Sequence, residues 1–188
     1  MGTRNSTLVK INKKIKVAQY GQWDGYPSGQ GVTILEILRN CNLDELKEKC
    51  SKVTQIKSSK LDKLWKQAHD LCGEKEKKMD IDFLSGFVSI KVADKFKEIN
   101  PHLHRDCGGE ILKHILNGVN EVDVDLDFAI GRGGYFGCEW CYVVDFDNNF
   151  LQVYNGTYTK EYMLKEFDLN SLPNEEEFLK ECEELKEN

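Results

Sequence analysis

Long apolar runs and a secretion signal are both missing from this sequence of 188 residues. No apolar stretch approaches the roughly 20 residues that a helix needs to span a bilayer. The N-terminal residues MGTRNSTLVKINKK lack the apolar core of a signal peptide. We therefore expect a cytoplasmic protein with no membrane partner.

Basic charge is also in short supply. The 26 Lys and Arg residues are outnumbered by 32 Asp and Glu residues, and the formal net charge is -6. Broad binding to a phosphate backbone needs a surplus of positive charge on one face. We expect no broad nucleic-acid binding, although a local basic pocket is compatible with this composition.

Proline is scarce, with 3 residues, whereas 40% of the chain is hydrophobic and 31% is charged. This composition is typical of a globular protein and unlike that of a disordered chain. A chain of this length buries roughly 70% of its unfolded surface on folding. The sequence predicts a single domain over residues 1–188, with a helical insertion at about 43–100.

The cysteines lack the spacing of a disulfide framework. There are 7 of them, an odd number scattered along the chain, which favours reduced thiols. Cys138 and Cys141 form a CxxC pair, but a spacing of three within a strand would place the two thiols on opposite faces. No second pair completes four ligands. We expect neither a metal site nor a cofactor.

Two β-hairpins are predicted, one near each end of the chain. Residues 7–11 and 15–20 are short β-prone runs around a turn, and CEWCYVVDFDNNFLQVYNG forms a second hairpin that turns at residues 147–149. The predicted class is α+β, in which the two hairpins share one antiparallel sheet packed with several α-helices.

Helices are predicted from apolar spacing and from end signals. Residues 43–78 are expected to form two helices joined near KSSK. Residues 82–99 are expected to form another helix, although SGFVSIKV, residues 85–92, fits a strand equally well. A half-buried strand is predicted at 121–130, before a loop at 131–137. The remaining expected helices are 32–40, one that begins near Asp106 and stops at Gly118, and an acidic one at 174–187 that opens with a capping box.

The stretch QYGQWDGYPSGQG, residues 19–31, is too rich in glycine for a strand interior and too aromatic for a solvated linker. Gly29 and Gly31 lead into a predicted helix, whose unpaired N–H groups and partial positive charge attract an anion. The spacing matches neither the nucleoside-triphosphate nor the dinucleotide fingerprint. The alternative is a tight turn around Pro27 that closes a small aromatic core.

A second glycine-opened helix start follows in RDCGGEIL, where Arg105 can bind a phosphate or a carboxylate. If the two starts face each other, they form an anion cleft in which Trp23 and Tyr26 stack on a base. No catalytic signature is present. Cys107, at the second helix start, is the thiol to test first because such a position lowers a thiol pKa.

The sequence resembles an uncharacterised family of proteins carried by bacteriophages and prophages. The resemblance rests on MGTRN, QYGQWDGYPSGQG, HRDCGGEIL, CEWCYVVDFD and LQVYNG, which are spread over most of the chain. Cys107 and Cys141 depart from the family pattern, which weakens a catalytic role for either thiol. Together with the loop chemistry, the resemblance implies these ligand-binding candidates: Arg4, Gln19, Gln22, Trp23, Asp24, Tyr26, Ser28, Gly29, Gly31, Arg105, Asp106, Gly108 and Glu139.

Three functions follow as hypotheses, all in the cytoplasm of a host bacterium. The first is capture of a small anionic, nucleotide-like ligand, such as a cyclic nucleotide that signals host defence. The second is inhibition of a host defence protein by direct contact, with the acidic C-terminal helix as the mimic of a charged partner. The third is hydrolysis of a nucleotide or an amide by Asp24, Glu139 or Cys107. The host-defence context is an analogy with accessory phage proteins. Each of the three hypotheses is compatible with a homo-oligomer.

Overall fold

The computed structural model describes residues 2–73, 89–123 and 137–183, which divide into two compact units. The first unit comprises Met1–Gln55 and Arg105–Asn188, and the second comprises Ile56–His104. None of the helices in the described part of the chain is long and apolar enough to cross a membrane. The expectations for residues 74–88, 124–136 and 184–187 fall outside the described residues.

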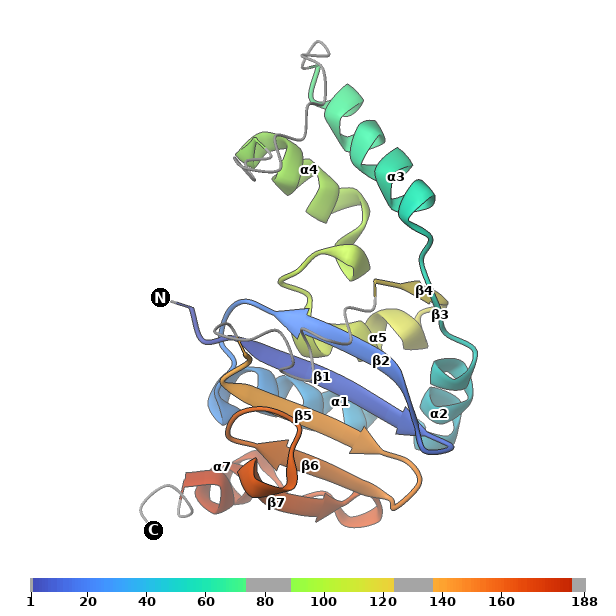
Figure 1. The fold of residues 1–188 in the computed structure, drawn as a ribbon. Coiled ribbons are helices and arrows are strands. Elements are labelled where there is room, and N and C mark those ends of the chain that lie inside the picture. Colours follow the sequence, from blue (N-terminus) through green and yellow to red (C-terminus); the bar gives the residue numbers. More distant parts are fainter. Residues whose placement is uncertain (1, 74–88, 124–136, 184–188) are drawn as a thin grey trace. The chain divides into compact units, whose positions relative to one another are not determined.

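The first unit is built on a five-stranded sheet, and the predicted α+β class is confirmed (Figure 1). Both predicted hairpins form. They join through a parallel pairing that places Leu8 opposite Val143, so the sheet is mixed and mostly antiparallel. In spatial order the strands are β2 (Lys14–Gly21), β1 (Asn5–Ile11), β5 (Trp140–Asp145), β6 (Phe150–Tyr154) and β7 (Met163–Asp168).

Helices cover one face of this sheet and enclose the main core (Figure 1). Apolar residues of each helix recur at a period near 3.6, so each helix buries one stripe. Val9, Leu35 and Tyr142 are each fully buried between the layers. The helices are α1 (Val32–Asn40), α2 (Leu43–Ser51), α5 (Ile111–Leu116) and α7 (Glu175–Glu183).

Short elements link these layers. The π-helical turn η1 (Pro27–Gly31) runs directly into α1, and the 3-10 turn η3 (Gly108–Glu110) runs into α5. A separate parallel pair joins β3 (Thr54–Gln55) to β4 (Glu121–Val122). Two further 3-10 turns, η5 (Lys160–Tyr162) and η6 (Leu169–Ser171), flank β7.

The capping box predicted at the start of the C-terminal helix is present. The Asn174 side chain accepts a hydrogen bond from the Glu177 backbone N–H at 2.9 Å, and the Glu177 carboxylate accepts one from the Asn174 N–H at 3.1 Å. Phe178 and Cys182 are fully buried one turn apart. The helix α7 is therefore an integral part of the first unit's core, with its acidic residues directed outward.

The second unit contains α3 (Ser58–Leu71), α4 (Ile90–Ile99) and the 3-10 turn η2 (Pro101–Leu103). Trp65 stacks on Phe96 with ring centroids 3.7 Å apart, within a small core of its own. The described residues of the ambiguous segment are helical from Ile90, because Val92 and Phe96 are buried four residues apart. The helix junction predicted near KSSK lies at residues 52–57, and Ser58 within KSSK begins α3.

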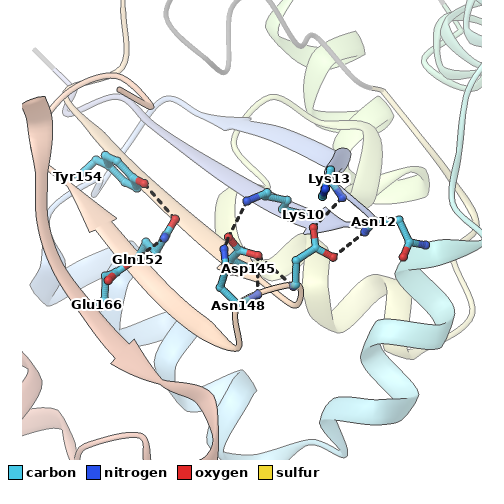
Figure 2. A network of polar contacts seen from close by, with 9 residues as sticks. Lys10, Asn12, Lys13, Asp145, Asn148, Gln152, Tyr154 and Glu166 are labelled. Carbon is cyan, nitrogen blue, oxygen red and sulfur yellow. Dashed lines mark hydrogen bonds and ion pairs between the residues drawn. The ribbon is translucent and has the colours of Figure 1, made fainter. Parts of the chain in front are cut away.

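The other face of the sheet carries a polar network (Figure 2). Lys10 Nζ lies 2.8 Å from Asp145 Oδ2, and Asn148 Nδ2 donates to the same oxygen at 2.9 Å. Burial raises the pKa of Asp145, but these hydrogen bonds outweigh burial, so the pKa is below its usual value. The hydrogen bond to Asp145 raises the pKa of Lys10, and both groups are therefore charged at neutral pH.

A neighbouring carboxylate fastens the two hairpin turns to each other. Asp147 accepts hydrogen bonds from the backbone N–H groups of Asn12 at 2.7 Å and Lys13 at 2.6 Å. Both donors have positive φ, 54° and 60°, as a tight two-residue hairpin turn requires. The contact explains why hairpins from opposite ends of the sequence meet in one register.

Candidate functional site

A buried asparagine, Asn5, anchors the glycine-rich loop that follows β2. Asn5 Nδ2 donates to the carbonyl oxygens of Gly21 at 3.2 Å and Trp23 at 3.1 Å. The Gly25 N–H donates to the Thr3 carbonyl at 3.0 Å, and the Tyr142 hydroxyl donates to the Gly25 carbonyl at 2.8 Å. The loop is therefore an ordered turn whose backbone is fixed by β1 and β5.

The amides that were expected to face an anion are used within the protein. The N–H groups of Gly29 and Gly31 donate to the Tyr26 carbonyl at 3.0 and 3.3 Å, and the Gln30 N–H donates to the Asp24 carbonyl at 2.8 Å. These bonds form the π-helical turn η1 ahead of α1. Any anion at this loop must therefore be held by side chains.

The second glycine-opened start does meet the loop. The Gly109 N–H donates to Gln30 Oε1 at 2.7 Å, across 79 positions of the chain. Gly108 has a φ of +51°, and a Cβ there would lie 2.4 Å from the same Gln30 oxygen. The two segments thus lie in contact as predicted. However, the Gly109 N–H, which was expected to face an anion, already donates to the side chain of Gln30.

Two arginines from distant segments lie near one phenol. Burial raises the pKa of Tyr20, and Arg105 and Arg4 oppose the rise, because positive charge within electrostatic range favours the phenolate. Arg4 Nε lies 3.6 Å from Glu139 Oε1, and Arg105 Nε lies 3.6 Å from Asp106 Oδ1. The arrangement therefore brings two guanidinium groups and two carboxylates to the same end of the sheet.

The predicted site residues divide into an outer set and an inner set. Trp23 and Tyr26 are 51% and 50% exposed, and the Arg105 side chain is 64% exposed. The other outer members are Asp24, Ser28 and Glu139, which are exposed, and Arg4, Gln22 and Asp106, which are half-buried. The inner set is Gln19, Gly31 and Gly108, which are buried, and Gly29, which is half-buried and packs against the Asp24 backbone. Only the outer set is placed to touch a ligand.

Each inner residue has a structural role. Gln19 is buried, and its Nε2 donates to the Tyr20 carbonyl at 2.9 Å. A Cβ on Gly31 would lie 3.0 Å from the Phe178 ring, and one on Gly29 would lie 2.3 Å from the Asp24 carbonyl oxygen. Glycine is needed at both positions for close packing.

The cysteines differ from the expectation in one respect. Cys138 precedes β5, so the strand alternation does not apply to it, and both Cys138 and Cys141 lie beside Ser6. Burial raises their thiol pKa values to about 11 and about 12. Cys107 is also buried. Within the described residues, no group of three or more His, Cys, Asp or Glu side chains is placed to hold a metal ion.

Sequence reasoning overlooked the residues that shape the loop from beneath, namely Asn5, Gln30 and Tyr142. Asn5 and Tyr142 sit in β-prone runs, where a polar group is easily assigned to a solvated face. Two features of the sequence could have revealed these residues: Asn5 lies next to the apolar run TLVKI, and Tyr142 lies among the apolar residues of CYVV. Both are fully buried, and a buried polar group needs a partner.

Replacing Tyr142 by phenylalanine is expected to lower the free energy of unfolding by about 1–3 kcal/mol, because the buried Gly25 carbonyl loses its donor. Chemical denaturation measures this loss. Hydrogen exchange should also speed up at the amides of Gly29 and Gln30, since the loop loses an anchor.

Tyr154→Phe is the matched control for this change. The Tyr154 hydroxyl donates to Gln152 Oε1 at 2.9 Å on the opposite face of the sheet (Figure 2). We expect a stability loss without faster exchange in the loop. Equal exchange in the two variants would show that Tyr142 does not anchor the loop.

Comparisons with models of protein families, with curated proteins and with solved structures found no match for this chain. The function is therefore inferred from the side chains at this end of the sheet.

Proposed function

We propose that the protein binds a small anionic, nucleotide-like ligand at the surface formed by the outer set of residues. The observation that carries this proposal is the convergence of three segments at one end of the sheet: the Gly25 N–H of the loop donates to the Thr3 carbonyl beside Arg4, and the Gly109 N–H of the segment that begins at Arg105 donates to Gln30 of the same loop. Each arginine also lies beside a carboxylate, Glu139 or Asp106, so the argument for an anion rests on the guanidinium donors and not on an excess of positive charge.

The chemistry of the neighbours specifies the kind of anion. A guanidinium group forms paired hydrogen bonds with phosphate or carboxylate oxygens, in a geometry that lysine does not offer. Trp23 and Tyr26, in the loop that follows β2, each expose about half of their surface. Exposed aromatic rings stack on heterocyclic bases and contribute about 1–3 kcal/mol per base. Phosphate and base together make a nucleotide the best-fitting class.

The carboxylates add selectivity and a means of release. Glu139 contacts Arg4 and Asp106 contacts Arg105, both at 3.6 Å. These separations are long for paired hydrogen bonds, so a phosphate can take over the guanidinium donors. The Arg4–Glu139 pair is partly exposed on both sides, and exposed ion pairs contribute only about 0–1 kcal/mol, so exchanging it for a phosphate costs little. Arg105 is also exposed, whereas Oδ1 of its partner Asp106 is buried.

Capture without turnover would lower the free concentration of a nucleotide signal. This agrees with the phage-protein resemblance, in which accessory proteins counter host defence. A hydrolase is the rival hypothesis for the same surface. Mass spectrometry of a bound nucleotide separates them, since turnover that is lost in Asp24→Asn would identify an enzyme.

Isothermal titration calorimetry against linear and cyclic nucleotides tests the proposal. Arg4→Ala and Arg105→Ala are each expected to weaken binding about tenfold or more, because each removes a charge-assisted contact worth about 1.5–3 kcal/mol. Trp23→Ala should also weaken binding of nucleotides but not of inorganic pyrophosphate.

Arg39→Ala is the matched control, because Arg39 is an exposed arginine near the end of α1. It should leave the affinity unchanged. The proposal fails if no nucleotide gives a binding signal, or if the two site variants bind as tightly as the unmodified protein.

A further inference from the structure

The second unit differs in charge from the rest of the chain. Residues 56–104 hold ten lysines and eight acidic residues, whereas the remaining residues hold sixteen basic and twenty-four acidic residues. Three of these lysines lie within α3 and three within α4, and a fourth lysine precedes α3 as its N-cap residue. Lys57, Lys60, Lys63 and Lys66 recur at every third position, and all four are exposed.

These four lysines, termed here the lysine ridge, follow one row of the helix surface. Side chains three apart are neighbours on a helix and form an oblique ridge, with a rise of about 4.5 Å per step. Because each step of three residues turns the helix by about 300°, the row winds around α3. Lys60, Lys63 and Lys66 lie on the side away from Leu61, Trp65 and Ala68, which pack in the core of the second unit, whereas Lys57 is the N-cap residue before the helix. Asp70, one turn beyond Lys66, marks the end of the ridge.

The position of this charge opposes the stability of the helix. Lys57 is the N-cap residue of α3 and makes no side-chain capping bond, and the first turn contains Lys60 but no acidic residue. A helix N-terminus carries partial positive charge, so lysine there is unfavourable by about 0.3–1 kcal/mol. A charge pattern that costs helix stability indicates selection for another purpose.

We infer that the lysine ridge is a contact surface for the phosphodiester backbone of a nucleic acid. Lysine is depleted at protein–protein interfaces, and the other exposed residues of α3 up to Gln67 are polar or acidic, namely Ser58, Ser59, Asp62 and Gln67. Hydroxyl and amide side chains with lysine are the usual partners of phosphate oxygens. The row offers no apolar anchor for a protein partner. This inference is independent of the proposed nucleotide site.

Fluorescence anisotropy with labelled DNA and RNA duplexes and the full chain tests the ridge. With three or four phosphate contacts, the logarithm of affinity should fall against the logarithm of salt concentration with a slope of about -3. Between about 50 and 200 mM salt, the affinity should drop about 40- to 150-fold. Comparing the two duplexes identifies the kind of nucleic acid.

K60Q/K63Q/K66Q should abolish most of this binding and reduce the slope by about 2.7, because three contacts are lost. Glutamine keeps helix propensity, and circular dichroism checks the fold. K14Q/K160Q/K180Q removes the same charge from exposed positions of the first unit and should bind normally. R4A/R105A should also bind normally, which separates this surface from the nucleotide site.

Two results would overturn the inference. One is an absence of duplex binding even at low salt. The other is an equal loss of binding in the two triple variants, which would show that net charge and not the ridge is responsible.

Discussion

Replacing Gly29 by alanine is expected to destabilise the first unit by about 3 kcal/mol. A Cβ at this position would lie 2.3 Å from the Asp24 carbonyl oxygen and 3.0 Å from the Asp24 Cβ. The obstacle is backbone, which cannot rotate away as a side chain can. Overpacking alone costs about 1–3 kcal/mol. Moving the Asp24 carbonyl also weakens its hydrogen bond with the Gln30 N–H, worth about 1 kcal/mol.

Thermal unfolding followed by circular dichroism measures this effect. For a protein of this size, about 3 kcal/mol corresponds to a Tm lower by about 6–12 °C. Gly137→Ala is the control, since a Cβ there would meet only Thr157 Cγ2 at 3.5 Å, an ordinary contact. A Gly29→Ala variant as stable as Gly137→Ala would show that the loop does not have the described turn.

The same variant informs the proposed function. If the Gly29 N–H bound the ligand, Gly29→Ala would lower the affinity of the folded protein as well as its stability, because the clash with Asp24 would displace that N–H. That N–H donates to the Tyr26 carbonyl instead. We therefore expect Gly29→Ala to reduce ligand binding only in proportion to the fraction of protein that is unfolded. Calorimetry on the folded fraction at low temperature separates the two effects.

Local sequence patterns predicted the hairpins well because each depends on neighbouring residues. The alternation in CYVVDF and the residues Asp147, Asn148 and Asn149 at the turn suffice to define β5 and β6. The strand β7 was not predicted. Its sequence MLKEFD places Phe167 inward and carries charges on both sides of it, so the period is weak.

The parallel junction between β1 and β5 could not be predicted from local patterns. It depends on contacts across about 135 positions, among them those of Lys10 with Asp145 and of Asn12 with Asp147. Either hairpin order satisfies the apolar alternation, so only the long-range polar partners discriminate. Their pairing is visible in the fold and not in either segment alone.

At the candidate site, residue types were predicted better than roles. Glycine and helix position correctly indicated a tight approach between residues 19–31 and 105–109. The predicted free amides were an incorrect consequence, because a helix start that continues a π-helical turn already has acceptors from Asp24 and Tyr26. The glycines therefore indicate close packing, and in the proposed site the arginines, not these amides, would bind the anion.

Replacing Phe178 by alanine is expected to cost about 3–5 kcal/mol, the largest effect considered for this protein. Phe178 is fully buried, its ring centroid lies 5.1 Å from that of Phe167, and it also packs beside Gly31. The loss of an aromatic ring here leaves a cavity between α7, β7 and η1. Chemical denaturation should show a lower midpoint for Phe178→Ala, and Glu176→Gln on the exposed side should change it by less than about 1 kcal/mol.

This prediction also decides how the acidic helix can be tested as a partner surface. Deleting residues 174–188 would remove Phe178 and Cys182 from the core, so a failed interaction would only report unfolding. E175Q/E176Q removes exposed negative charge without placing lysine at the helix N-terminus, and it leaves the capping residues Asn174 and Glu177 in place. Loss of a host protein from this variant, with unfolding unchanged, would support inhibition by contact. If Phe178→Ala proved as stable as Glu176→Gln, α7 would not be packed as described and the deletion would become the proper test.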